Sequence, residues 1–145
     1  MTLLILNIAF IWGNSLLSAE ASQAFSDWVK DILFPGRDGN GLRQGSGLLR
    51  KIAHFTEFTC LGMCLTWLFG MLREKKAERL LLPLAAGITA AAIDETIQLF
   101  VPLRGPSVKD VGIDTAGVIL GIVIITLSIV IKKKKQNKLL EEKTL

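Results

Sequence analysis

Charged and polar side chains that could bind or convert a ligand fall into three groups along the chain. The first group is Arg50, Lys51, His54 and Glu57, the second is Asp94, Glu95 and Gln98, and the third is Arg104, Ser107, Asp110 and Asp114. Carboxylates and histidine are the side chains that bind divalent cations, activate water or act as general acid and base. An arginine guanidinium instead binds phosphate or carboxylate through forked hydrogen bonds, better than a lysine does. The residue types therefore indicate either catalysis on a polar substrate or binding of a charged head group.

The spacing within each group is that of neighbours on one helix face, three or four residues apart. The pairs are His54 and Glu57, Asp94 and Gln98, and Asp110 and Asp114. The series from Asp114 continues through Gly117 and Gly121, a stripe of small residues along which another helix can approach closely. The aspartates are thus predicted to face the interior of a helix bundle.

The helices that must carry these groups correspond to four apolar blocks, at about residues 2–18, 51–72, 80–101 and 111–131. A helix needs ~20 apolar residues to cross a bilayer, and three blocks reach that length while the first is marginal. The blocks are apolar around most of the helix circumference, whereas the helices of a soluble bundle, the alternative, would each show a polar face. We therefore predict one all-α domain over residues 1–145, an integral membrane four-helix bundle.

Basic residues at the ends of the blocks indicate how the bundle is oriented. They cluster between the second and third blocks and directly after the fourth: Arg73, Lys75, Lys76 and Arg79, then Lys132, Lys133, Lys134 and Lys135. Short loops rich in lysine and arginine stay in the cytoplasm, so both termini and the basic tail, residues 132–145, are expected there. The tail is expected to be a helix extension or disordered. At ~1.5 Å of rise per residue, the three polar groups then share one layer near the outer ends of their spans.

The first apolar block has a second interpretation. Ala19-Glu20-Ala21 has the small-x-small form of a signal-peptide cleavage site, so a secretory signal removed after insertion is an alternative. The charged start of a signal peptide is missing, however, because only the amino terminus supplies positive charge ahead of Leu3. We therefore favour a retained first span.

Two further features are predicted on the outer side, between the first and second spans. Apolar residues at helical spacing from Phe25 to Leu33 include Trp28, which favours a helix lying in the membrane interface. From Pro35 to Gly47 glycines alternate with polar and charged residues. Such a segment cannot form a packed element, and a mobile, glycine-rich connection is expected.

Two other classes of site are not supported by the composition. Cys60 and Cys64 are the only cysteines, and their spacing inside an apolar block lacks the four-ligand pattern of a structural zinc site, so they are predicted to be packing residues. The net charge of +4 could indicate nucleic acid. The basic residues flank the apolar blocks, however, and form no face with interleaved aromatics. No nucleic-acid partner is therefore expected.

The acids of the polar layer require an explanation, because a carboxylate facing lipid near a helix centre costs ~2.5–3.5 kcal/mol. One explanation is structural. Basic residues at the same level, Arg50, Lys51, Arg104 and Lys109, could pair with the acids and hold the short loops together in an internal ion-pair network. The other explanation is a functional site.

Three motifs resemble those of the VanZ-like family of bacterial membrane proteins. They are Arg50-Lys51-x-x-His54-x-x-Glu57-Phe58, Asp94-Glu95-x-x-Gln98, and Arg104-x-x-Ser107-x-x-Asp110-x-x-x-Asp114-x-x-Gly117, with a weaker match at Asn14, Ser15 and Ser22. The family pattern commonly has tyrosine at the position of Phe58 and asparagine at that of Asp114. The resemblance implies a multi-pass protein of the bacterial cytoplasmic membrane, linked to low-level resistance to teicoplanin, a lipid-tailed glycopeptide antibiotic.

Two functions follow from these residues and the resemblance. In the first, the protein binds or shields an amphiphile, either a lipoglycopeptide or a lipid-linked cell-wall precursor, and membrane lipids surround it. The expected ligand-binding residues are Arg50, Lys51, Gln98, Arg104, Ser107, Asp110 and Asp114.

In the second, the protein is a membrane enzyme acting on a lipid head group at the outer leaflet. The candidate catalytic residues are His54, Glu57, Asp94 and Glu95, and the candidate metal ligands are Glu57, Asp94 and Asp110. His54-x-x-Glu57 differs from the HExxH spacing of zinc proteases and occurs once, unlike the repeated motif of di-iron bundles. The sequence therefore identifies no cofactor and ranks binding above catalysis.

Overall fold

The chain folds into helices throughout the part that the computed structural model describes, residues 1–17, 24, 27–29, 32, 46–73, 75–102 and 107–144. The helices are α1 (Thr2–Ser15), α3 (Ser46–Leu72), α4 (Lys76–Gln98) and α5 (Val108–Thr144). No strand occurs within these ranges. The all-α prediction is therefore confirmed.

Three of the helices are long and apolar enough to cross a membrane, over Arg50–Leu72, Lys76–Gln98 and Val108–Glu142. They contain or overlap the predicted spans 51–72, 80–101 and 111–131. The shorter α1 is apolar but has 14 residues, or roughly 21 Å of helix, less than the ~30 Å hydrocarbon core. Large apolar side chains such as Leu6, Phe10 and Leu127 are exposed, as expected where a helix faces lipid. The chain is an all-helical membrane protein.

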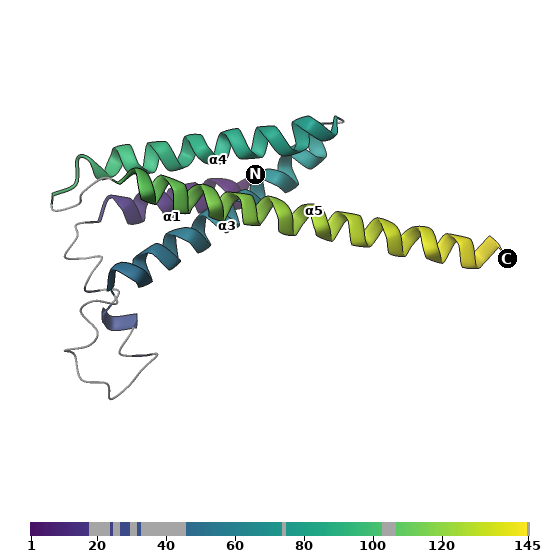
Figure 1. The fold of residues 1–145 in the computed structure, drawn as a ribbon, viewed down its shortest axis with the longest axis horizontal. Coiled ribbons are helices and arrows are strands. Elements are labelled where there is room, and N and C mark those ends of the chain that lie inside the picture. Colours follow the sequence, from purple (N-terminus) through teal and green to yellow (C-terminus); the bar gives the residue numbers. More distant parts are fainter. Residues whose placement is uncertain are drawn as a thin grey trace.

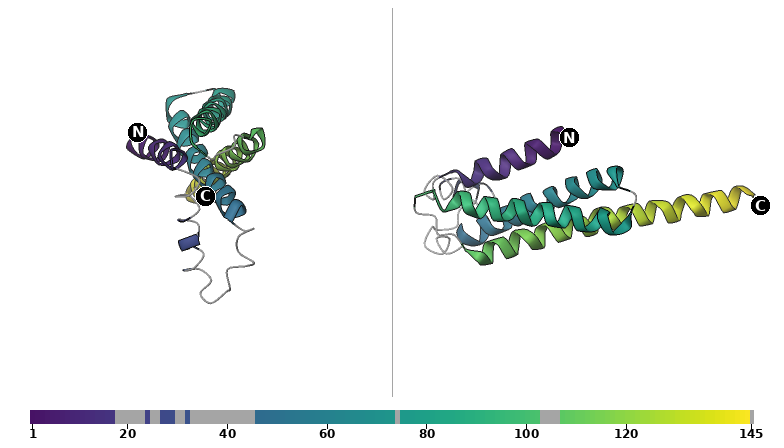
Figure 2. Two further views of the ribbon diagram at one scale, coloured as in Figure 1. Left: turned by 90° about the vertical axis from the view of Figure 1, so that its left-hand side faces the viewer. Right: turned by 90° about the horizontal axis from the view of Figure 1, so that it is seen from above.

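The helices lie side by side, and the same end of the bundle holds the end of α1, the start of α3, the end of α4 and the start of α5 (Figures 1 and 2). We call this the polar end, and define it by Ser15, Arg50, Gln98 and Ser107. The carboxyl-terminal half of α5 extends beyond the other helices (Figure 1). The basic tail is therefore a helical extension of α5, which is one of the two structures expected for the tail.

The closest helix contact is between α3 and α5, and it depends on the glycine stripe of α5. A Cβ at Gly117 would lie 2.5 Å from the carbonyl oxygen of Phe55, and one at Gly121 would overlap the carbonyl oxygen of Thr59. A larger residue at either position would therefore push the two backbones apart. The close approach predicted from the small-residue spacing is confirmed.

Val118 brings a third helix into this contact. A Cβ at Gly62 of α3 would overlap the backbone of Val118, and a Cβ at Gly87 of α4 would lie 2.5 Å from its side chain. The fully buried Val118 thus fits between two glycines on different helices. The surrounding core consists of Ile11, Phe58, Leu61, Leu65, Ala90, Ala91 and Ile122.

Some predicted features fall largely outside the described residues. These are the interfacial helix, of which only Ala24, residues 27–29 and Ile32 are described and helical, the glycine-rich connection, and Arg104. Cys60 and Cys64 are free thiols that lie half-buried in α3. That position agrees with their predicted role in packing.

Candidate functional site

Each helix delivers part of the polar layer to the polar end because of the direction in which it runs. Arg50, Lys51, His54 and Glu57 lie in the first turns of the apolar part of α3; Asp94, Glu95 and Gln98 lie in the last two turns of α4; Ser107, Asp110 and Asp114 lie at the start of α5. The α4 helix runs opposite to α3 and α5 (Figure 1). The late residues of α4 therefore meet the early residues of the other two helices.

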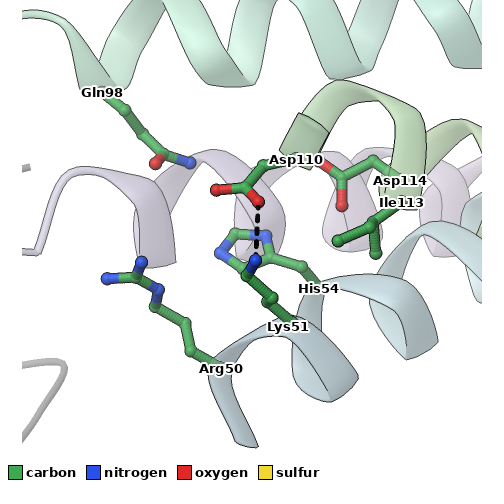
Figure 3. Close-up of a pocket in the computed structure, with 7 residues that line it drawn as sticks. All are labelled: Arg50, Lys51, His54, Gln98, Asp110, Ile113 and Asp114. Atoms are coloured by element: carbon green, nitrogen blue, oxygen red, sulfur yellow. Dashed lines mark ion pairs between the residues drawn. The ribbon is translucent and has the colours of Figure 1, made fainter. Parts of the chain in front are cut away.

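A pocket opens between these helices and is lined by Arg50, Lys51, His54, Gln98, Asp110, Ile113 and Asp114. Lys51 and His54 extend from α3 toward Asp110 and Asp114 of α5 (Figure 3). The space between the walls is small and partly open to the surface. It therefore suits a small polar group better than a whole large ligand.

The innermost part of the layer is a compact cluster of His54, Asp94 and Asp114, one residue from each of α3, α4 and α5. Each offers one possible metal-ligand atom, and these atoms lie within 4.8 Å of one another. The three residues are buried, with exposed fractions of 8%, 0% and 3%. Two ionised carboxylates about 5 Å apart repel by roughly 3 kcal/mol at an effective dielectric constant of about 20. The cluster therefore favours a bound cation or a shared proton.

Gln98 connects this cluster to α1. Its Nε2 donates to Oδ2 of Asp94 at 2.9 Å and to Oγ of Ser15 at 3.3 Å, and all three residues are buried. The amide thus fixes one oxygen of Asp94 without supplying a compensating charge. Gln98 also lines the pocket, and its role in ligand binding stays a prediction beside these structural hydrogen bonds.

Glu57 lies beside His54 and is bound by α1. Asn14 Nδ2 donates to Oε1 of Glu57 at 3.0 Å. The Nδ1 atom of His54 is 3.9 Å from both Oε2 of Glu57 and Oδ2 of Asp94. His54 is therefore close to two carboxylates from different helices, an arrangement that suits a general base or a cation ligand.

Two side chains of α1 thus belong to the site but were not predicted as site residues. Asn14 binds Glu57, and Ser15 accepts a hydrogen bond from Gln98. Both are uncharged and precede the charged groups by more than 30 residues in the chain. Two weak sequence signals indicated them: two polar residues stand together at the end of the first apolar block, and both belong to the weaker part of the family resemblance.

Glu95 and Ser107 fix the start of α5 instead of lining the pocket. A carboxylate oxygen of Glu95 accepts the backbone N–H of Ser107, and the Ser107 hydroxyl accepts the N–H of Lys109 at 3.2 Å. A serine at this position caps a helix by satisfying a backbone donor that has no partner within the helix. The structure therefore gives Ser107 a capping role, and its role in ligand binding stays a prediction.

The described basic residues of the layer make few direct contacts with its acids. Lys51 Nζ lies 3.5 Å from Oδ1 of Asp110. The Arg50 guanidinium, by contrast, makes no hydrogen bond or ion pair with any described side chain, although it lines the pocket. Among the described residues, the ion-pair network expected under the structural explanation is thus reduced to Lys51 with Asp110 and the two longer contacts of His54.

Only one of the three predicted metal ligands belongs to the compact cluster. Asp94 belongs to the compact cluster, whereas Glu57 lies beside it, bound to Asn14, and Asp110 pairs with Lys51. His54 and Asp114 complete the cluster instead. Helical spacing predicted which face of each helix carries the polar residues. It did not predict which of these residues lie at the same depth in the bundle.

Comparison with known proteins gives one match. A protein-family model described as VanZ/LLP1 matches residues 1–130. No curated protein and no solved structure matches the chain. The matched range includes α1, α3, α4 and the apolar part of α5, and therefore the whole of the site described above.

Proposed function

The chain belongs to the VanZ-like family of membrane proteins, and from this premise we propose that it binds an amphiphilic ligand whose polar head enters the pocket at the polar end. The observation that carries the proposal is the pocket itself, in which the Arg50 guanidinium makes no hydrogen bond or ion pair with a described side chain. A guanidinium can hold a phosphate or carboxylate by two parallel hydrogen bonds. The apolar helix faces beside it suit the ligand's hydrocarbon chain.

The distribution of basic residues along the chain supports a location of this pocket on the outer side of the membrane. The end of the bundle opposite to it carries Arg73, Lys75, Lys76 and Arg79, and α5 continues into Lys132, Lys133, Lys134 and Lys135. Lysine and arginine in short loops favour the cytoplasmic side. In this proposal the protein lies in the bacterial cytoplasmic membrane with both termini inside, so the pocket opens at the outer leaflet.

Two kinds of ligand at the outer leaflet have the required chemistry, lipid-linked cell-wall precursors and lipid-tailed glycopeptides. The first carries phosphate at the membrane surface, a small anionic group of the kind that a guanidinium at the pocket wall binds. Binding or shielding of either one would account for the low-level teicoplanin resistance with which the family's founding member is associated. We take the phosphate-bearing lipid as the first ligand to test.

The test compares Arg50→Ala with Arg73→Ala, which removes the same side chain just beyond the opposite end of α3. A hydrogen bond to a charged group contributes about 1.5–3 kcal/mol, so Arg50→Ala is expected to raise Kd for a lipid-linked precursor roughly ten- to hundredfold. Arg73→Ala is expected to bind like the wild type. Equal Kd values for all three proteins, measured in nanodiscs, would refute the proposal.

A second candidate function, an enzyme acting on the same head group, is favoured by the position of His54 between carboxylates of Glu57 and Asp94. This candidate is tested by measuring whether the protein converts the lipid-linked precursor. Incubation of the purified protein with the lipid-linked precursor should give a product detected by mass spectrometry, and His54→Ala should abolish the product while the lipid still binds. Binding without any product, with or without added divalent cations, would eliminate this candidate.

A further inference from the structure

The compact cluster of His54, Asp94 and Asp114 is built more like a cation site than like part of an ion-pair network. We propose that these three residues bind one divalent cation of the Mn²⁺ or Zn²⁺ type. The proposal concerns the inner end of the pocket, whereas the proposed head-group binding concerns Arg50 at its wall. Either can therefore hold without the other.

The geometry of the cluster is the first argument. Its three donor atoms come from three helices and lie within 4.8 Å of one another. Donors bound to one ion at about 2.1 Å lie about 3–4 Å apart, so rotation of these side chains by a small angle brings all three to bonding distance. His54 and Asp114 also line the pocket, which provides the path of entry.

The second argument is a buried carboxylate oxygen that lacks a partner. Asp94 is fully buried, its Oδ2 accepts from Gln98, and its Oδ1 has no hydrogen-bond partner in the part of the chain that the structure describes. An amide that holds one ligand oxygen in place is a typical support for a metal ligand. The carboxylate thus keeps one buried oxygen that a bound ion would satisfy, while its Oδ2 lies 3.9 Å from Nδ1 of His54. Asp114 likewise makes no hydrogen bond or ion pair with a described residue.

The third argument is the charge around the cluster. The carboxylates at this end are Glu57, Asp94, Glu95, Asp110 and Asp114, and the described basic residues near them are Arg50, Lys51 and Lys109. Of these three cations, only Lys51 lies within 4 Å of a described carboxylate, and that carboxylate belongs to Asp110. A divalent cation at His54, Asp94 and Asp114 would compensate the charge where no described lysine or arginine does.

The donor set selects the kind of ion. Ca²⁺ and Mg²⁺ prefer sites made entirely of oxygen, whereas one imidazole with carboxylates suits Mn²⁺, Fe²⁺ or Zn²⁺. Three protein ligands leave further coordination positions open toward the pocket, where water or a ligand oxygen can bind. We expect Mn²⁺ and Zn²⁺ to bind more tightly than Ca²⁺.

The experiment titrates metal-free protein in detergent with Mn²⁺ and follows the free ion by electron paramagnetic resonance, with no lipid ligand added. The wild type should bind one Mn²⁺ per chain, and Asp94→Asn, Asp114→Asn and His54→Ala should each raise Kd by at least about tenfold. Glu78→Gln, which removes a carboxylate near Lys75 at the opposite end of the bundle, is the matched control and should leave Kd unchanged. No saturable binding, or equal Kd in the wild type and Asp94→Asn, would overturn the proposal.

Thermal unfolding separates loss of a ligand from loss of the fold. Mn²⁺ should raise the Tm of the wild type and of Glu78→Gln but not that of Asp114→Asn. Without metal, Asp114→Asn should unfold at or above the wild-type Tm, because the substitution removes a negative charge from the cluster. A lower Tm for Asp114→Asn with the same Mn²⁺ response as the wild type would show a purely structural aspartate and refute the site. Arg50→Ala should keep its Mn²⁺ binding, so failure of the head-group proposal remains distinguishable.

Discussion

Two amide side chains link single residues of the polar end across helices. Gln98 joins Asp94 to Ser15, and Asn14 holds Glu57. An amide satisfies a carboxylate oxygen without adding a positive charge, so it holds the acid in a fixed position without acting as its counter-ion. The polar end is therefore stabilised across helices by neutral hydrogen-bond donors.

Gln98→Ala should lower the stability of the bundle, because it removes donors from a buried carboxylate and a buried hydroxyl. Loss of such a partner costs about 1–3 kcal/mol, which equilibrium unfolding in mixed micelles can measure. Thr96→Ala is the matched control on the same helix, since Thr96 is exposed and binds only the carbonyl of Ala92. Equal stabilities for the two variants would contradict a structural role for Gln98.

At the scale of single residues, the sequence predicted the charged members of the site better than the neutral ones. His54, Asp94 and Asp114 were found because ionisable groups inside apolar blocks are rare and costly. Asn14 and Ser15 cost less to bury and carry no comparable signal, so their contacts became visible only once α1 was placed. The capping role of Ser107 was not predicted, because it depends on where the backbone of α5 begins.

At the scale of the elements, the position of α5 against α3 is set by glycine. Gly117 and Gly121 face backbone carbonyl groups of α3, while Gly112, on the same helix, has open space where a Cβ would stand. Membrane helices lack a hydrophobic force that drives them together and depend on close packing instead. The absence of side chains at the first two positions is therefore a structural requirement.

Gly121→Ala should accordingly destabilise the bundle, since the added Cβ overlaps the carbonyl of Thr59. Overpacking of this kind costs about 1–3 kcal/mol. Gly112→Ala should be neutral or stabilising by up to about 1 kcal/mol, because alanine favours the helix. The fraction of folded protein during titration with denaturing detergent tests the pair. Comparable losses in both variants would show that the effect is not one of packing.

The spans themselves followed from hydrophobic blocks, but the helix ends did not. The α4 helix already begins at Lys76, and α5 continues past residue 131 to Thr144, since lysine, glutamate and glutamine are good helix formers outside the apolar region. The first span was predicted to reach residue 18, whereas α1 ends at Ser15. Hydropathy indicates which residues of a helix are surrounded by lipid. The helix itself ends where its backbone hydrogen bonds end, which hydropathy does not indicate.

At the scale of the whole molecule, α1 is integrated into the bundle. Ile11 and Ser15 are fully buried, and Asn14 and Ser15 bind residues of α3 and α4. Cleavage after residue 21 would remove all of these contacts. We therefore expect amino-terminal sequencing of the membrane-purified protein to read residues of α1. A sequence that begins at Ser22 would establish the signal-peptide alternative.

The proposed orientation can be tested by labelling in intact cells. Lys75→Cys and Lys109→Cys each place a thiol at an exposed position, on opposite ends of the bundle, in a background with Cys60 and Cys64 replaced by alanine. A membrane-impermeant maleimide should label the Lys109→Cys variant before lysis and the Lys75→Cys variant only after lysis. The reverse pattern would place the pocket on the cytoplasmic side.

The fit of Val118 between Gly62 and Gly87 has a consequence for how this scaffold can change. Val118 lies one helical turn below Asp114, so an apolar wedge beneath the cluster helps to set the spacing of the three helices that carry it, alongside the ion pair of Lys51 with Asp110. The wedge residues are thus distinct from the donor residues of the cluster. A protein engineer could exchange the donor atoms above the wedge for another set, such as three histidines, and expect the same three-helix frame to present them.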